Sequence, residues 1–239
     1  MKEVSGMPGS NASSAWQGLI TVNGPNLADV QRSQYVIPNQ VIGSISYILP
    51  DLNYKATTLS LFYRGYSPYG NSFMYSNDMN GDGYGNDLIY IPKAKGEIKF
   101  ASQADEDAFF AFMEQDSYLK KNKGNYAEAY SARAPWVHKF DFRILQDFKV
   151  KAGKTVNTLQ LSFDILNVGN IFNSKWGVNK NMAASNYGRI LRYEGKDANN
   201  VPSFSMVKVS GEYPTKTYDT YLNYGQCWSL QVGLRYIFN

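Results

Sequence analysis

Residues 227–239 alternate between apolar and polar side chains along the whole segment. The apolar positions are Trp228, Leu230, Val232, Leu234, Tyr236 and Phe238. The positions between them include Ser229, Gln231, Gly233 and Arg235. A period of two predicts one β-strand with a single apolar side. This strand is longer than the roughly five or six residues of a typical strand.

Four upstream segments repeat this alternation, at residues 41–49, 57–63, 136–150 and 155–168. In each, leucine, valine, isoleucine and aromatic residues occupy one side, although Ile42 and Ile48 blur the first segment. The opposite side includes full charges such as Asp141, Arg143 and Asp164. The pattern therefore predicts about five long amphipathic strands.

The connections between these strands alternate between short and long. Residues 50–53 and 151–154 are short turns, whereas residues 66–135 and 169–226 form connections of roughly 70 and 58 residues. Compact soluble domains rarely contain such loops, but outer-membrane barrels combine short periplasmic turns with long outer loops. A β-sandwich would show the same alternation along its strands. The strand and loop lengths favour an all-β, antiparallel transmembrane β-barrel fragment, because crossing a bilayer takes roughly 9–11 residues per strand.

Local signals predict some structure inside the long connections. Ser102 followed by Asp105 is typical of a helix start, and the apolar spacing predicts a helix to about Leu119. Residues 12–16 are expected to form one short helical turn. Asn23-Gly24, Asn80-Gly81 and Asp82-Gly83 indicate turns.

Composition agrees with strands that have two different faces. Aromatic residues make up 15% of the 239 residues, yet mean hydropathy is −0.40, as expected when apolar and polar positions alternate. The net charge of +4 is dispersed, so no nucleic-acid-binding patch is evident. Cys227 is the only cysteine, which excludes an intrachain disulfide. The acidic residue at position 3 and the lack of an apolar run predict that no signal peptide is present.

Several segments, taken in order, resemble the C-terminal end of TonB-dependent outer-membrane receptors of the SusC-like or Oar-like group, which begins with a carboxypeptidase-regulatory-like domain. These segments are residues 4–10, 78–83, 86–92, 132–136, 140–148, 159–170 and 234–238. The run Phe163-Asp164-Ile165-Leu166-Asn167-Val168-Gly169-Asn170 and the aromatic terminal strand are the more specific parts.

The resemblance implies a barrel of about 22 strands with a plug, which imports a large nutrient such as an oligosaccharide, peptide or chelate. It implies the outer membrane of a Gram-negative bacterium, with lipids, the plug and other strands, the TonB complex and a surface lipoprotein as partners. Residues 1–34 would be an outer loop segment and residues 35–239 the C-terminal part of the barrel. Five strands are odd in number and leave open edges, so we expect a fragment with a structural and solute-gating role.

An Asp/Asn-rich loop offers oxygen ligands at alternate positions before a glycine turn. The candidate metal ligands are Asp78, Asn80, Asp82, the Tyr84 carbonyl and Asp87. Hard cations such as Ca²⁺ take six to eight oxygen ligands, so Ca²⁺ is the cofactor this loop would bind. Ile89 stands where an EF-hand has its twelfth-position glutamate. A plain turn that closes an outer loop is the alternative.

Aromatic residues suggest two further roles. Tyr63, Tyr66, Tyr69 and Tyr75 are candidates for a rim that stacks on a solute, with a membrane girdle as the alternative. Tyr236 and Phe238 resemble the aromatic end that barrel-assembly machinery recognises. The only histidine, His138, lies beside Trp136 and is expected at a membrane interface.

No nucleophile–base pair or Gly-x-Ser-x-Gly motif is present, so an enzyme is not expected. The rival hypothesis is a soluble or surface-exposed β-rich binding module with a calcium-stabilised loop.

Overall fold

The computed structural model describes residues 2–3, 11–27, 29–49, 55–68 and 70–238. The chain forms two compact units, each assembled from three separate stretches. Unit 1 comprises Met1–Pro38, Pro68–Ala134 and Lys180–Asp219. Unit 2 comprises Asn39–Ser67, Pro135–Asn179 and Thr220–Asn239. None of the helices in the described ranges has the length and apolar character needed to cross a membrane.

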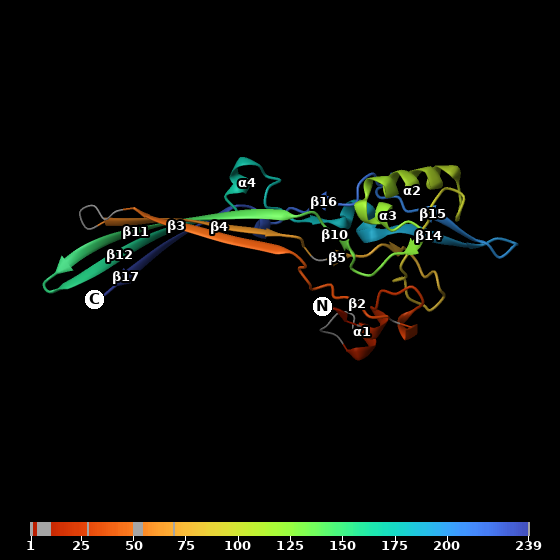
Figure 1. The fold of residues 1–239 in the computed structure, drawn as a ribbon, viewed down its shortest axis with the longest axis horizontal. Coiled ribbons are helices and arrows are strands. Elements are labelled where there is room, and N and C mark those ends of the chain that lie inside the picture. Colours follow the sequence, from red (N-terminus) through yellow and green to blue (C-terminus); the bar gives the residue numbers. More distant parts are fainter. Residues whose placement is uncertain (1, 4–10, 28, 50–54, 69, 239) are drawn as a thin grey trace. The chain divides into compact units, whose positions relative to one another are not determined.

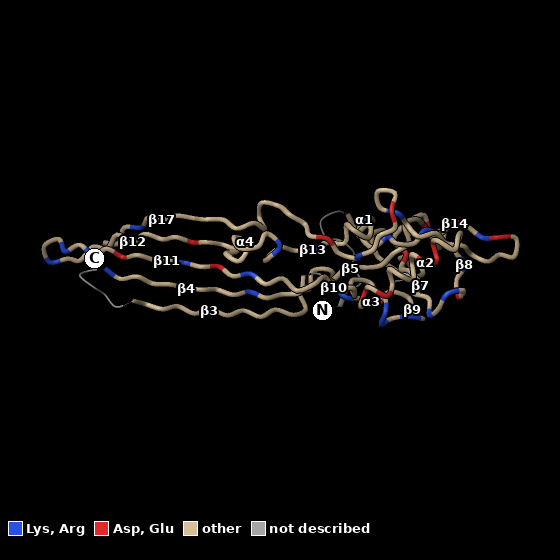
Figure 2. The backbone as a smooth tube through the Cα atoms, turned by 90° about the horizontal axis from the view of Figure 1, so that it is seen from above, with Lys and Arg blue, Asp and Glu red and all other residues tan. Residues whose placement is uncertain are grey.

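Unit 2 is built on a five-stranded sheet, drawn from two directions in Figures 1 and 2. Its antiparallel strand order is β17-β12-β11-β4-β3. The strands are β3 (Gln40–Leu49), β4 (Lys55–Tyr66), β11 (Val137–Ala152), β12 (Thr155–Leu166) and β17 (Ser229–Ile237). The five predicted long strands are confirmed, and the structure as a whole is mostly β. Within the described residues, β3 and β17 each pair with one strand, so the sheet is open.

The register aligns residues of the same kind across all five strands. One row consists of Ile45, Leu61, Phe142, Ile165 and Leu230. The next row consists of Ser46, Ser60, Arg143, Asp164 and Gln231. Successive residues of a strand point to opposite sides. We call the side with the first row the apolar face and the side with the second row the polar face.

The connections of this sheet differ between its two ends. Tyr66 pairs with Gln40 on one side and Val137 on the other, so the long connection from Tyr66 to Val137 begins and ends at the same end of the sheet. Leu166 pairs with Ser229 near this end, so the second long connection returns there as well. At the other end, two residues join β11 to β12, and Gly153 has the positive φ of +67° that such a tight hairpin favours. The short turn predicted at 151–154 is confirmed. The turn predicted at 50–53 lies outside the described residues.

Unit 1 has a hydrophobic core of its own, which the sequence patterns did not predict. Helices α2 (Gln103–Gln115) and α3 (Ser117–Lys121) lie with a four-stranded sheet of order β6-β14-β15-β8. These strands are β6 (Met74–Tyr75), β14 (Arg189–Lys196), β15 (Pro202–Met206) and β8 (Lys99–Phe100). The largest fully buried apolar side chains include Phe73, Ile89, Phe109, Phe112, Met113, Leu119 and Ile190.

The predicted helix at 102–119 is two helices. Ser102 caps α2 by accepting a hydrogen bond from the Asp105 backbone N–H at 3.1 Å, as expected. The helix ends at Gln115 because Asp116 is extended and starts α3, accepting from the N–H groups of Tyr118 and Leu119. The single helix to Leu119 was therefore wrong in its extent.

The remaining elements are short. The helical turn predicted near residues 12–16 is confirmed as α1 (Ala12–Gln17). The others are β1 (Lys2–Glu3), η1 (Pro25–Leu27), β2 (Gln31–Arg32), β5 (Gly70–Asn71), β7 (Tyr90–Ile91), β9 (Asn125–Tyr126), β10 (Ala132–Arg133), α4 (Gly169–Phe172), β13 (Lys180–Asn181), η2 (Met182–Gly188), β16 (Asp219–Thr220) and η3 (Tyr224–Gln226).

Candidate functional site

Among the described residues, the side chains of the apolar face of unit 2 are exposed or half-exposed apart from Gly65. Ile45 and Leu234 are each 69% exposed and Val232 is 59% exposed. Only Gly65 and Val137 of the five strands are buried. A continuous exposed apolar surface of this kind marks an interaction site, because leaving it in water is unfavourable.

Charged side chains are almost confined to the polar face. Figure 2 shows no charged residue on β3, and β12 and β17 have one each, Asp164 and Arg235. The register puts the following charged residues on the polar face: Arg64, Lys139, Asp141, Arg143, Asp147, Lys149, Lys151, Asp164 and Arg235. Lys55, at the first position of β4, is the exception, and its ammonium lies 6.0 Å from the Phe148 ring centre.

The polar face is held together by side-chain pairs between neighbouring strands. Arg143 forms a two-pronged ion pair with Asp164, in which Nη2 donates to Oδ2 at 3.1 Å and Nε donates to Oδ1. The hydroxyls of Ser46 and Ser60 are 2.8 Å apart. Pairs directly opposite each other across strands stabilise a sheet.

Thr57 and Gln146 are polar residues on the apolar face that form hydrogen bonds within the sheet. The Thr57 hydroxyl donates to Gln146 Oε1 at 2.6 Å, and Gln146 Nε2 donates to the Ala56 carbonyl at 3.2 Å. These side chains are uncharged and bonded to the sheet itself.

An aromatic cluster lies on the apolar face at the end of the sheet where β4 ends and β11 begins. The Tyr63 hydroxyl lies 2.8 Å from His138 Nδ1, and the Tyr63 ring centre lies 4.9 Å from that of Phe140. The Trp136 and His138 rings stack at 6.0 Å. The Tyr63 hydroxyl covers Gly65, where a Cβ atom would collide with it. His138 thus lies among aromatic side chains, and its place at a membrane interface stays a prediction.

The four tyrosines predicted to form a rim do not form one cluster in the described residues. Tyr66 donates to Asn179 Oδ1 at 2.9 Å, and the Arg64 guanidinium lies 4.5 Å from its ring centre. Tyr69 lies outside the described residues. Tyr75 is buried in the core of unit 1, where it stacks on Phe204 at 5.5 Å. Burial raises the pKa of Tyr75 to about 12, and the side chain is not available to a solute.

The segment after β12 uses two asparagines to organise the end of the sheet. Asn167 Nδ2 donates to the Gln226 carbonyl at 2.8 Å. Asn170 Nδ2 donates to the Trp176 carbonyl at 3.0 Å, and its Oδ1 accepts from the Trp228 N–H at 3.2 Å. The asparagines of the most distinctive sequence run therefore tie β12 to the start of β17.

The Asp/Asn-rich loop is folded around its own carboxylates. Asp78 Oδ1 accepts from the Gly81 N–H at 2.7 Å, and Oδ2 accepts from the Gly83 N–H at 2.8 Å. Asp82 Oδ1 accepts from the Tyr84 N–H at 2.8 Å. Gly81 and Gly83 have φ values of +80° and +92°, so the predicted glycine turns are confirmed.

Asp87 anchors this loop from inside. It is 2% exposed, and its Oδ2 accepts from the Met79 N–H at 2.7 Å while Oδ1 accepts from Asn80 Nδ2 at 2.7 Å. Burial is the main cause that raises the pKa of Asp87, and the charges of Asp82 and Asp78 add to it. Across the described ranges no group of three or more His, Cys, Asp or Glu has a metal-binding arrangement. Calcium binding by this loop stays a prediction.

The aromatic terminal strand presents its last rings together. Tyr236 and Phe238 meet edge to face with ring centres 4.6 Å apart. They are 50% and 78% exposed. Both rings are accessible, and their recognition by an assembly machinery stays a prediction.

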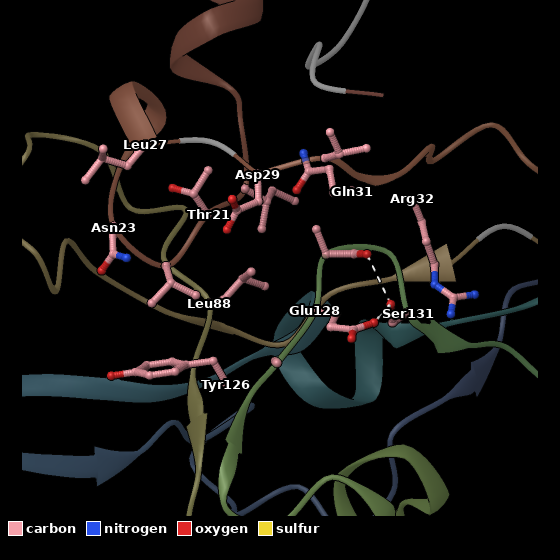
Figure 3. Close-up of a pocket in the computed structure, with 15 residues that line it drawn as sticks. Thr21, Asn23, Leu27, Asp29, Gln31, Arg32, Leu88, Tyr126, Glu128 and Ser131 are labelled. Carbon is pink, nitrogen blue, oxygen red and sulfur yellow. Dashed lines mark hydrogen bonds between the residues drawn. The ribbon is translucent and has the colours of Figure 1, made fainter. Parts of the chain in front are cut away.

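Unit 1 contains a cavity of about 430 Å³, shown in Figure 3. Buried Leu88, Ala127 and Ala129 form its apolar part. Charged Asp29, Arg32 and Glu128 line it as well, and the Ser131 hydroxyl donates to Glu128 at 3.0 Å. Sequence reasoning missed this cavity, because its lining comes from segments 20–32, 88 and 126–131, which share no local pattern.

Comparisons with family models, with curated proteins and with solved structures found no match to this chain.

Proposed function

We propose that unit 2 is part of the membrane-spanning wall of a TonB-dependent receptor in the outer membrane of a Gram-negative bacterium. The chain would be the C-terminal barrel portion, with a structural and solute-gating role in the import of a large nutrient. The observation that carries this proposal is that nearly all charged residues of the five strands lie on the polar face of the sheet. Lys55 at a strand end is the only charged residue of the five strands on the apolar face.

A membrane-spanning wall suits both faces, with lipid on the apolar face and water on the polar face. Each charge placed on the lipid side near the bilayer midplane costs roughly 2–4 kcal/mol, and this cost falls toward the interfaces. Lys55 is at a strand end, where a long side chain reaches water. The aromatic band of Tyr63, Trp136 and His138 is at a strand end as well, the position of interfacial aromatic residues.

The open edges argue for further strands. Strands β3 and β17 have 10 and 9 residues, enough to cross a bilayer at a tilt. Unpaired backbone groups are costly in lipid, so both edges need partners there. The rest of the receptor would supply these strands together with the plug. The TonB complex and a surface lipoprotein would be the other partners.

The second candidate function is a soluble or surface β-rich binding module. The independent core and the cavities of unit 1 favour it. In this case a calcium-stabilised loop predicts that calcium raises the melting temperature of the parent chain but not of the Asp78→Ala/Asp82→Ala variant.

Vesicle flotation separates the two candidates. The full chain, refolded with and without outer-membrane lipid vesicles, is expected to float with the vesicles and to keep floating after an alkaline wash. Strands of unit 2 should be protected from added protease in the floated fraction. A chain that stays monomeric in plain buffer and leaves vesicles on washing contradicts the membrane proposal.

A further inference from the structure

A cavity of about 250 Å³ in unit 1 brings two arginines together without an acidic residue. Its lining consists of Arg32, Ser33, Val36, Pro38, Gly70, Tyr130 and Arg133. Arg32 is on β2 and Arg133 on β10, so the two cations come from distant parts of the chain. The lining of this cavity thus holds two guanidinium groups and no carboxylate, although Arg32 also lines the 430 Å³ cavity with Asp29 and Glu128.

Arg133 has hydrogen-bonding capacity that its described neighbours do not use. Its Nη1 atom is buried and has no hydrogen-bond partner among the described residues. A buried donor without a partner is unfavourable, and more so when the group is charged. Such groups are rare in native structures and call for a missing water, ion or ligand.

The electrostatics of Arg133 agree with a missing anion. Burial lowers the pKa of Arg133, and the positive charge of Arg32 lowers it further. The negative charge of an oxyanion between the two guanidinium groups would offset both effects, because a guanidinium fork pairs with the oxygens of carboxylate, sulfate or phosphate.

Gly70 and Ser33 form part of the wall of this cavity. Gly70 pairs with Arg133 between β5 and β10, and a Cβ atom at position 70 would collide with the Tyr130 carbonyl. Glycine at position 70 therefore lets the Tyr130 backbone lie close against β5 beside the cavity. Among the described residues, the buried Ser33 hydroxyl accepts only a long contact of 3.4 Å from the Tyr35 N–H, so its own hydrogen is another donor for the cavity.

Another cavity, of about 380 Å³, adjoins the cavity of the two arginines and shares Gly70 and Tyr130 with it. Its other lining includes Tyr35 and Tyr187, which are 57% and 63% exposed, together with Gln34 and Asn71. Exposed tyrosine faces and side-chain amides suit the ring and hydroxyl groups of a sugar.

We propose that Arg32 and Arg133 bind the acidic group of a sugar whose ring occupies the adjoining tyrosine-lined cavity. The acidic group is a carboxylate, sulfate or phosphate, since all three present oxygens to the guanidinium forks. The proposal concerns unit 1 and does not depend on whether unit 2 lies in a membrane.

Calorimetric titration of the full chain with matched sugars tests it. Galacturonate is compared with galactose, and glucose 6-phosphate and glucose 6-sulfate with glucose. At least one acidic sugar should bind at least about tenfold more tightly than its neutral partner, the size expected for charge-assisted hydrogen bonds. The preferred member identifies the acidic group.

Variants that remove one charge locate the site. Arg133→Met and Arg32→Met should each lower the affinity for the preferred sugar by about tenfold or more. Arg192→Met is the matched control, because Arg192 is on β14, pairs with Glu194 at 3.6 Å and loses the same charge outside the cavity. Circular dichroism checks folding, and Arg32→Met decides the outcome if Arg133→Met does not fold.

Three results would overturn the proposal. One is that none of the acidic sugars binds. Another is equal affinity for acidic and neutral sugars. The third is an affinity that changes as much in Arg192→Met as in Arg32→Met, which would indicate a general charge effect. None of these results bears on vesicle flotation, so failure here is distinguishable from failure of the membrane function.

Discussion

At the scale of single residues, the lack of a side chain at Gly65 makes room for the Tyr63 side chain. Tyr63 lies over Gly65 and reaches His138 across to β11. In detergent, Gly65→Ala is expected to displace Tyr63 and lower the free energy of unfolding by roughly 1 kcal/mol, the size of one hydrogen bond. Gly43→Ala is the matched control, since a Cβ atom there meets nothing within 4 Å. Equal losses in the two variants would contradict the packing described.

Asp87 makes the stability of unit 1 depend on pH. Its pKa in the folded protein is raised above the ordinary value of 3.8, mainly by burial. The unfolded chain therefore loses this proton at lower pH than the folded chain does. Stability from this group is full below pH 3.8 and is lost as pH rises through the raised pKa.

Asp87→Asn removes this titration and tests it. Urea unfolding at a series of pH values, with a chelator present, should give a difference in free energy between parent and variant that changes through acidic pH. The parent loses stability relative to the variant as pH rises. A difference that is constant with pH would contradict the raised pKa.

At the scale of elements, Asp116 separates two helices and fixes the second one. Its side chain is 6% exposed, caps α3, and accepts from the Thr217 hydroxyl at 2.6 Å. Asp116→Ala should destabilise unit 1 by roughly 2 kcal/mol, because it removes a cap and leaves buried groups unmet. Asp107→Ala, at an exposed position paired with Lys95, should change stability much less. Urea unfolding monitored by helix content measures both.

The sequence predicts the sheet well because its signal is local. Each strand repeats apolar residues every second position, so Leu159, Leu161 and Phe163 indicate a face without knowledge of the neighbours. The break at Asp116 has a weaker local signal, an aspartate that caps the next turn, which the apolar spacing obscured. Arg32 and Arg133 meet only through tertiary folding, so no window of sequence shows their cavity.

The candidate sites likewise divide into features with a local sequence signal and features that depend on tertiary contacts. The glycine turns of the Asp/Asn loop follow from residue type, and Gly81 and Gly83 have the positive φ that turns favour. The burial of Tyr75 does not follow from residue type, because tyrosine occurs at rims and in cores alike. Its place depends on Phe204, which is far away in the sequence.

At the scale of the whole molecule, the two units differ in how much of their apolar surface they bury. Unit 1 buries a hydrophobic core that includes Phe73, Phe109 and Phe112, whereas the sheet of unit 2 leaves its apolar face uncovered in the described residues. In plain buffer we expect the chain to associate through this face. Val232→Asp should reduce the association measured by analytical ultracentrifugation. Gln231→Asp, on the polar face of the same strand, is the control and should leave it unchanged.

The central claim is that lipid covers the apolar face and water reaches the polar face. Spin labels placed singly along β12 from Leu159 to Ile165, in a Cys227→Ser background and in lipid vesicles, test it most directly. Collision with oxygen, which partitions into lipid, should peak at 159, 161, 163 and 165. Collision with a water-soluble nickel chelate should peak at 160, 162 and 164. Equal access of the nickel chelate to all seven positions would contradict the membrane-spanning sheet.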